Sequence, residues 1–377
     1  MILEKYMHAL PDPLDTIKKL DEYVIGQEEA KKNLGVLLLV RALMRLQKNG
    51  RIPQDVEIQK SNLLLIGPTG SGKTQLMRAL SEIADVPILI KDVTGITSAG
   101  YIGGKVEDIL VEYVNLVEDY TKNSYKEVTP ESNEDTYAVY QTKNDILHDN
   151  LESGIIYLDE IDKIVRKESS TDVTGDMVQN ELLKVLEGET IKLTNSRLQY
   201  PKSGLHEVNT KYITFICGGA FSGLAEVIHN RIAKKSSIGF TTELNHLNKE
   251  KDVSKILRLV KTEDLVTYGF KQEFLGRLPL KASLDELTLP VMTTIITKPK
   301  NAIYKRYTEF FKLFNIEFSI DKAGLKEIAQ QALDLKMGAR SLTQIFNRLF
   351  INDLTNIFTI KNQKLKLTKS DVIARLK

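Results

Sequence analysis

The sequence of 377 residues contains one cysteine and no tryptophan. A single cysteine cannot form an internal disulfide, and it excludes every zinc site built from cysteines alone. Cys217 lies in the apolar stretch YITFICGG, where we interpret it as a small buried hydrophobic residue. This cysteine usage is typical of a protein in a reducing compartment.

An excess of either charge is also absent. Lysine and arginine number 52 and the acidic residues 50, so the composition gives no general reason to expect binding to nucleic acid or to an acidic membrane. The most apolar run, LGVLLLVRALM, is interrupted by Arg41 well short of the roughly 20 residues that span a bilayer. The first residues contain Glu4 and no long apolar core, unlike a secretory signal. We therefore expect a cytoplasmic protein with no membrane or nucleic-acid partner.

Short apolar runs alternate with helical patterns along the first three quarters of the chain. The alternation predicts an α/β fold whose parallel sheet carries helices on both faces. Helices are expected after Lys73, from about Lys105, and from about Met177 to Leu186, because apolar residues recur there every three or four positions. The expected buried strands lie at 62–67, 87–92, 154–160 and 212–219.

From Pro290 the pattern is mainly helical and shows no further core strand, which predicts a smaller α-rich C-terminal domain. Two polar stretches, 121–152 and 241–255, are expected to be long loops of the kind that are functional or disordered. The expected organisation is an N-terminal extension at 1–13, a large α/β domain at 14–287 with a polar insertion at 121–152, and a small domain at 288–377.

The stretch GPTGSGKT follows an apolar strand pattern and precedes a helical one, the context that a phosphate-binding P-loop requires. Backbone amides of such a loop, together with the helix N-terminus, bind phosphates. Lys73 is expected to neutralise charge on the β- and γ-phosphates, and the Thr74 hydroxyl to bind Mg²⁺. The expected nucleotide-binding residues are Gly67, Pro68, Thr69, Gly70, Ser71, Gly72, Lys73 and Thr74.

A second apolar strand pattern, GIIYLDEIDK, ends in two adjacent carboxylates. Asp159 is expected to hold Mg²⁺, and Glu160 to orient and activate water for attack on the γ-phosphate. Water as the nucleophile indicates a nucleoside triphosphatase rather than a small-molecule kinase. The alternative is a solvated pair of acids at a strand end.

The stretch AGYIGG places Tyr101 and Ile102 between glycines, ahead of a helical pattern. One interpretation is a mobile loop with an aromatic tip. The other is a turn whose tyrosine packs back onto the core, which these six residues alone favour.

Nine stretches of the chain occur in the order found in ClpX, the family of AAA+ unfoldases that feed the ClpP protease. The chain resembles this family from about Pro11 to its C-terminus. The resemblance implies an AAA+ fold, ATP and Mg²⁺ as cofactors, and a homo-hexameric ring with nucleotide between subunits. The stretches are LDEYVIGQEEAKKNL, GPTGSGKT, AGYIGG, IIYLDEIDKI, VQNELLKVLEG, ITFICGGAFSGL, SSIGF, QEFLGRLP and MGARSL.

The resemblance also implies roles for residues outside the two carboxylates and the P-loop. Val24 and Ile25 would line the adenine pocket. Arg277 would reach the γ-phosphate of a neighbouring subunit as a catalytic finger, and Arg340 would contact the phosphates of its own subunit. Taken singly, each arginine is more often part of a surface ion pair, and that alternative loses weight only because both lie in matching motifs. Tyr101 and Ile102 would grip substrate in the axial pore, and 168–176 would form a second pore loop.

In the same family, an exposed tip docks in clefts of the peptidase ring. The corresponding residues are Ile238, Gly239 and Phe240, and the alternative is a turn with Phe240 packed inside.

Three departures from the family are expected. Its N-terminal zinc-binding domain is not expected, because one cysteine cannot supply the ligands. Its basic pore-entrance loop is replaced by NSRLQYPKSGLHE, where Arg197, Lys202 and His206 are dispersed. The insertion at 121–152 occupies the place of a whole domain in the related HslU unfoldase, but it is far shorter.

The leading hypothesis is an ATP-dependent unfoldase that threads unfolded or tagged proteins through a pore into a ClpP-like peptidase. Two alternatives are a remodelling enzyme that works without a protease and a nucleotide-dependent assembly scaffold.

Overall fold

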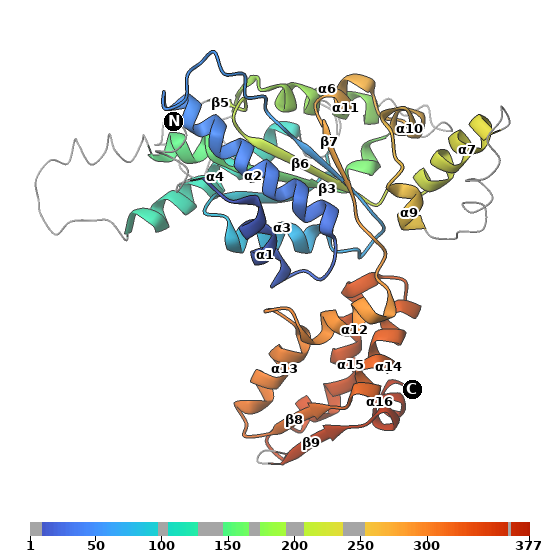
Figure 1. The fold of residues 1–377 in the computed structure, drawn as a ribbon. Helices are drawn as coiled ribbons and strands as arrows, with labels where there is room; N and C mark the ends of the chain where they lie inside the picture. The colour runs from blue at the N-terminus through green and yellow to red at the C-terminus, as the bar shows by residue number, and fades with distance from the viewer. Residues whose placement is uncertain are drawn as a thin grey trace, which may run out of the picture.

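The computed structural model describes residues 10–96, 105–126, 146–165, 174–193, 207–236, 253–360 and 363–377. These residues form two bodies (Figure 1). We call residues 13–283 the sheet body and residues 289–377 the C-terminal body, and residues 284–288 are the linker between them. No helix among the described residues is long and apolar enough to cross a membrane.

A five-stranded parallel sheet is the centre of the sheet body. The strand order is β2-β3-β6-β1-β7, so β6 lies between β1 and β3. In the register of the sheet, Leu64 of β1 lies opposite Cys217 of β6 and Lys281 of β7. The strands are β1 (Leu63–Ile66), β2 (Ile88–Asp92), β3 (Ile155–Asp159), β6 (Thr214–Gly219) and β7 (Leu280–Ser283).

Helices cover both faces of this sheet, which explains why its central strands consist mainly of buried apolar residues. Successive residues of β1 point to opposite sides, so Leu63 and Leu65 join one buried cluster while Leu64 and Ile66 join the other. The first cluster is covered by α1 (Pro13–Asp21), α2 (Glu28–Lys48) and α3 (Lys73–Ile83) (Figure 1). The second is covered by α4 (Val106–Lys126), α6 (Thr174–Glu187), α7 (Leu224–Ser236), α10 (Thr262–Tyr268) and α11 (Gln272–Gly276).

The remaining described elements of the sheet body are small. A two-stranded antiparallel pair joins β4 (Thr190–Lys192) to β5 (Glu207–Asn209), and η2 (Ile161–Ile164) directly follows β3. The short helix α9 (Val253–Leu257) packs beside α7.

The four strands expected from apolar runs are confirmed, but β7 was missed. Among the described strands, β7 lies at the edge of the sheet and pairs only with β1. Two of its four residues, Leu280 and Lys281, are only half-buried. The continuous apolar run that marks a strand buried on both faces is therefore absent from its sequence.

The expectation of a loop throughout 121–152 is wrong at both ends of that stretch. α4 continues to Lys126, and residues 146–153 are helical. Residues 146–153 are held against α2: Arg41 donates to the Ser153 carbonyl, and Arg45 and Lys48 pair with Asp149 and Glu152. The segment between these helices lies outside the described residues.

The C-terminal body has its own apolar core, in which Phe311, Phe346 and Phe350 are fully buried. Its helical elements are α12 (Leu289–Thr297), α13 (Ile303–Lys312), α14 (Lys322–Asp334), η5 (Gly338–Arg340), α15 (Ser341–Thr355) and α16 (Lys369–Leu376). The body is mainly helical, but the expectation of no further strand is wrong. β8 (Glu317–Ile320) and β9 (Lys364–Leu367) form a parallel pair, and each is a four-residue strand that is only partly buried, so neither contains a continuous apolar run.

Candidate functional site

Residues 67–72 of the glycine-rich stretch GPTGSGKT lie between the end of β1 and the start of α3, and Lys73 and Thr74 begin α3, as the sequence predicted. Gly70 has φ 76° and Gly72 has φ 106°, a left-handed backbone region that favours glycine. Because α3 begins at Lys73, the loop presents backbone amides and the positive end of a helix to the same space. This arrangement is suited to binding an anion.

Lys73, the first residue of α3, is buried beside this loop. Its Nζ donates to the carbonyl oxygens of Gly67, at 2.6 Å, and Pro68, at 3.1 Å. Burial lowers the pKa of Lys73 to about 8, although the nearby Asp159 carboxylate acts in the opposite direction. A phosphate that reached the loop would offer Nζ stronger acceptors than these two carbonyls and would favour its charged form.

Thr74 and Asp159 meet across the sheet body. The Thr74 hydroxyl donates to Asp159 Oδ2 at 2.7 Å, although one residue follows β1 and the other ends β3. A hydroxyl and a carboxylate at this spacing are the oxygen donors that Mg²⁺ prefers beside a phosphate. The donor set therefore fits the expected ion.

Glu160 lies next to Asp159 in an unusual backbone conformation. Its φ of 58° and ψ of 33° are left-handed, which costs a residue other than glycine about 1–2 kcal/mol. Its backbone N–H donates to Asp159 Oδ1 at 2.9 Å. The strained turn places the two carboxylates in one cavity, and such strain is often found at functional sites.

The cavity has a volume of about 900 Å³, enough for a nucleotide, and both bodies contribute to its walls. From the sheet body come the loop, α3, the end of β3, and Ala220 and Ser222 after β6. From the C-terminal body come side chains for which the sequence offered no signal. They include Ile295, Pro299, Lys300 and Arg306.

Arg340 is brought to this cavity by direct packing between the two bodies. The Ala339 N–H is 3.4 Å from the Gly70 carbonyl oxygen. Gly70 and Gly338 lie so close that a Cβ on Gly70 would be 2.3 Å from the Met337 carbonyl oxygen. The MGAR segment therefore contacts the phosphate-binding loop itself, and Arg340 is near enough to influence the pKa of Lys73.

The two residues expected beside adenine are not in the cavity wall. Val24 is buried in the core under α2, and Ile25 is half-buried. Their neighbour Tyr23 does line the cavity, and Lys300 lies over its ring at 5.5 Å. The contact of Val24 and Ile25 with adenine stays a prediction.

Arg277 lies at the amino ends of the parallel strands, whereas the cavity lies at their carboxyl ends. It precedes β7, and its carbonyl accepts a hydrogen bond of 2.9 Å from the side chain of Asn62, which precedes the neighbouring β1. The phosphate-binding loop follows β1, and that strand alone spans about 13 Å. Arg277 does not line the cavity of its own chain.

The Arg277 side chain forms the surface ion pair that the alternative interpretation predicted. Its Nη2 is 2.8 Å from Glu187 Oε1, and the arginine side chain is 51% exposed. The guanidinium therefore remains accessible from outside the chain.

Several residues of the sequence analysis lie outside the described residues. They are Tyr101, Ile102, 168–173, Arg197, Lys202, His206, Ile238, Gly239 and Phe240.

The glycine-rich loop joins β1 to α3, and the two carboxylates lie at the end of β3, which is separated from β1 by the single strand β6. This arrangement defines a P-loop nucleoside triphosphatase. The family model of the AAA domain (Cdc48 subfamily) matches residues 58–281. The chain is 38% identical over 361 residues to the ATP-dependent Clp protease ATP-binding subunit ClpX of Treponema denticola, which covers 94% of this chain and 80% of that protein. The chain belongs to the AAA family, as a ClpX-like ATPase.

Proposed function

We propose that the protein is a cytoplasmic ATP-dependent unfoldase that forms a homo-hexameric ring and threads unfolded or tagged proteins into a ClpP-like peptidase. The observation that carries this proposal is the similarity to a ClpX subunit along 94% of the chain, which includes both bodies and the cavity between them. A cavity between two bodies couples its contents to their relative orientation, as a motor requires.

In the proposed mechanism the loop amides and Lys73 bind the phosphates of ATP, while Val24 and Ile25 contact the adenine. Thr74 and Asp159 would hold Mg²⁺, which supplies charge neutralisation at the phosphates. Glu160 orients a water molecule and accepts its proton during attack on the γ-phosphorus. Arg340 contacts the same phosphates from the C-terminal body.

Arg277 completes the site of the neighbouring subunit in this proposal. Its place at the far edge of the sheet and its exposure support a role between subunits, since the arginine lines no part of its own cavity. A planar, permanently charged guanidinium stabilises charge that develops on the transferred phosphoryl group.

The test of unfolding is the replacement of Tyr101 by alanine. We expect the variant to keep its fold, its ring and its ATP hydrolysis, but to consume at least about tenfold more ATP for each stable tagged substrate that it unfolds. Aromatic and apolar contact grips a polypeptide of almost any sequence, and glycines let the loop move with its subunit. The measurement is ATP consumed per substrate unfolded, together with the melting temperature.

The same experiment distinguishes the packed-turn interpretation of AGYIGG. If Tyr101→Ala lowers the melting temperature markedly and spares unfolding per ATP, the tyrosine is a packing anchor. A pore loop would then have to lie elsewhere.

The test of the peptidase partner is the replacement of Ile238 and Phe240 by serine. We expect association with a ClpP-like peptidase to be lost while ATP hydrolysis and unfolding persist. Burial of two large apolar side chains in each subunit contributes about 3–6 kcal/mol before ordering costs, and a ring multiplies this through avidity. Degradation of an unfolded test protein measures the association, and unchanged degradation would contradict the assignment of the docking residues.

A further inference from the structure

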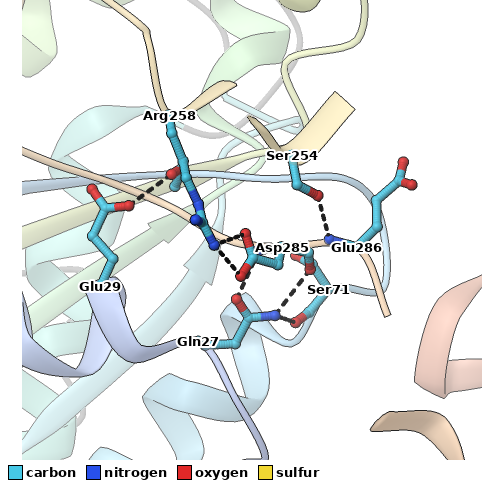
Figure 2. A network of polar contacts seen from close by, with 8 residues as sticks. Gln27, Glu29, Ser71, Ser254, Arg258, Asp285 and Glu286 are labelled. Carbon is cyan, nitrogen blue, oxygen red and sulfur yellow. Dashed lines mark hydrogen bonds and ion pairs between the residues drawn. The ribbon is translucent and has the colours of Figure 1, made fainter. Parts of the chain in front are cut away.

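Gln27 occupies a constrained position just before α2. Gly26 and Gln27 both have left-handed backbones, with φ of 71° and 65°, and Gln27 is 5% exposed. Its place in the sequence alone indicates no role for its side chain. The two left-handed residues turn the chain so that the Gln27 side chain points away from α2, toward the phosphate-binding loop and the linker (Figure 2).

The Gln27 amide joins two segments that are far apart in the sequence. Its Nε2 donates to the Ser71 carbonyl oxygen at 3.0 Å and to the Asp285 carbonyl oxygen at 3.0 Å. Its Oε1 accepts the Asp285 N–H at 2.8 Å. All three partners are backbone atoms, so the bonds depend on where the two segments lie rather than on their side chains (Figure 2).

One of these segments binds phosphate and the other carries the C-terminal body. Ser71 lies inside the glycine-rich loop, between Gly70 and Gly72. Asp285 lies in the linker between β7 and α12. One buried side chain, Gln27, therefore separates the phosphate-binding loop from the linker that joins the two bodies.

Other contacts give the linker a defined orientation at this point. Arg258 Nη2 donates to both carboxylate oxygens of Asp285, at 2.8 and 2.7 Å. The Glu286 N–H donates to Ser254 Oγ at 2.7 Å. The residue before Asp285 is fixed to β1, since the Leu284 N–H donates to the Ile66 carbonyl oxygen at 2.7 Å. The linker is thus held directly by Ile66, Ser254 and Arg258 of the sheet body, and Gln27 connects it to the phosphate-binding loop.

We propose that Gln27 is a positioning residue that ties the phosphate-binding loop to the linker, so that nucleotide in the loop sets the orientation of the C-terminal body. The buried Gln27 amide uses its two N–H donors and its oxygen in these three hydrogen bonds. Loss of any one bond is unfavourable, because no water would replace the lost partner. The loop and the linker therefore move together. This inference rests on ATP binding in the loop and is independent of protein unfolding and of a peptidase.

The orientation of the C-terminal body can be measured as a distance between two spin labels. Cys217 is buried, and burial raises the pKa of its thiol to about 12, so it does not compete for labels. Cysteines introduced at the exposed positions Lys32 on α2 and Lys322 on α14 would report on the two bodies. Pulsed electron resonance on labelled full chains, diluted with unlabelled chains, gives the distance within one subunit. The probe is a slowly hydrolysed ATP analogue.

For the parent protein we expect the analogue to shift this distance. Gln27→Ala is expected to bind the analogue within about threefold of the parent, yet to lose about half or more of the shift. Gln27→Asn keeps an amide and tolerates a left-handed backbone, but it is one methylene too short, so we expect the same loss. Ser283→Ala is the matched control, because it breaks only the 2.8 Å bond to Glu29 beside the linker and leaves Gln27 untouched.

Any of four distance results would overturn the proposal. They are a full shift in Gln27→Ala, a shift restored by Gln27→Asn, a parent distance that does not respond to the analogue, and a loss in Ser283→Ala equal to that in Gln27→Ala. A fall of more than about tenfold in analogue affinity would place Gln27 in nucleotide binding instead, which also contradicts the proposal. None of these measurements needs a protein substrate, so their failure is distinct from failure of the proposed unfoldase.

Discussion

Replacing Glu160 with glutamine is expected to slow ATP hydrolysis by about a hundredfold or more while ATP binding and ring formation persist. Glutamine has the shape of glutamate but cannot accept a proton from water. Binding should survive, because the loop, Lys73 and the Thr74–Asp159 contact do not depend on the Glu160 side chain. Single-turnover hydrolysis measures the rate, and a fluorescent ATP analogue measures binding.

The matched control is Glu82→Gln. Glu82 is a carboxylate that lines the same cavity, but from the last turn of α3 rather than from the end of β3. Its neutralisation is expected to leave turnover within about threefold of the parent. Near-normal hydrolysis in Glu160→Gln would contradict the assignment, and a loss as large in Glu82→Gln would show that cavity charge, not proton transfer, sets the rate.

Rings composed only of Arg277→Ala subunits are expected to hydrolyse ATP about a thousandfold more slowly, the lower end of the effect of an arginine finger. Mixing them with Glu160→Gln subunits should partly restore activity. A site needs Glu160 from one subunit and Arg277 from the next, so about a quarter of the interfaces in an equal mixture would be intact. The measurement is ATPase rate against mixing ratio, with mixed rings verified by differential tags.

Glu187→Gln provides the control for this experiment. It removes the partner of Arg277 within the chain, at an exposed pair where the direct energetic effect is small. We expect near-parent hydrolysis from this variant. No recovery at any mixing ratio, with mixed rings present, would mean that Arg277 acts within its own subunit or outside catalysis.

The site was predicted from sequence where its residues are neighbours in the chain. GPTGSGKT and the LDE ending of GIIYLDEIDK each combine a buried strand with a fixed local pattern. A strand that ends in a loop and a helix must place that loop at the carboxyl edge of a parallel sheet, so the local pattern already determines the position. The structure confirms that β1 and β3 are parallel, and it brings Thr74 to Asp159.

Arg277 shows the limit of such reasoning. Its motif suggested a role, but only the sheet register shows that it lies beside Asn62, at the edge away from the loop. Arg277 precedes β7, and the strand that would have placed it at this end of the sheet was not predicted because its sequence lacks a continuous apolar run.

The sequence by itself determined the phosphate-binding loop, the carboxylate pair and the alternation that builds a parallel sheet, because each depends on spacing along the chain and on burial of apolar residues. Tertiary structure alone decided that Lys300 and Tyr23 share a cavity wall and that Gln27 holds both Ser71 and Asp285. Those bonds go to backbone atoms, which every residue carries alike. A hydrogen bond to a backbone atom leaves no residue type in the sequence by which its partner can be recognised.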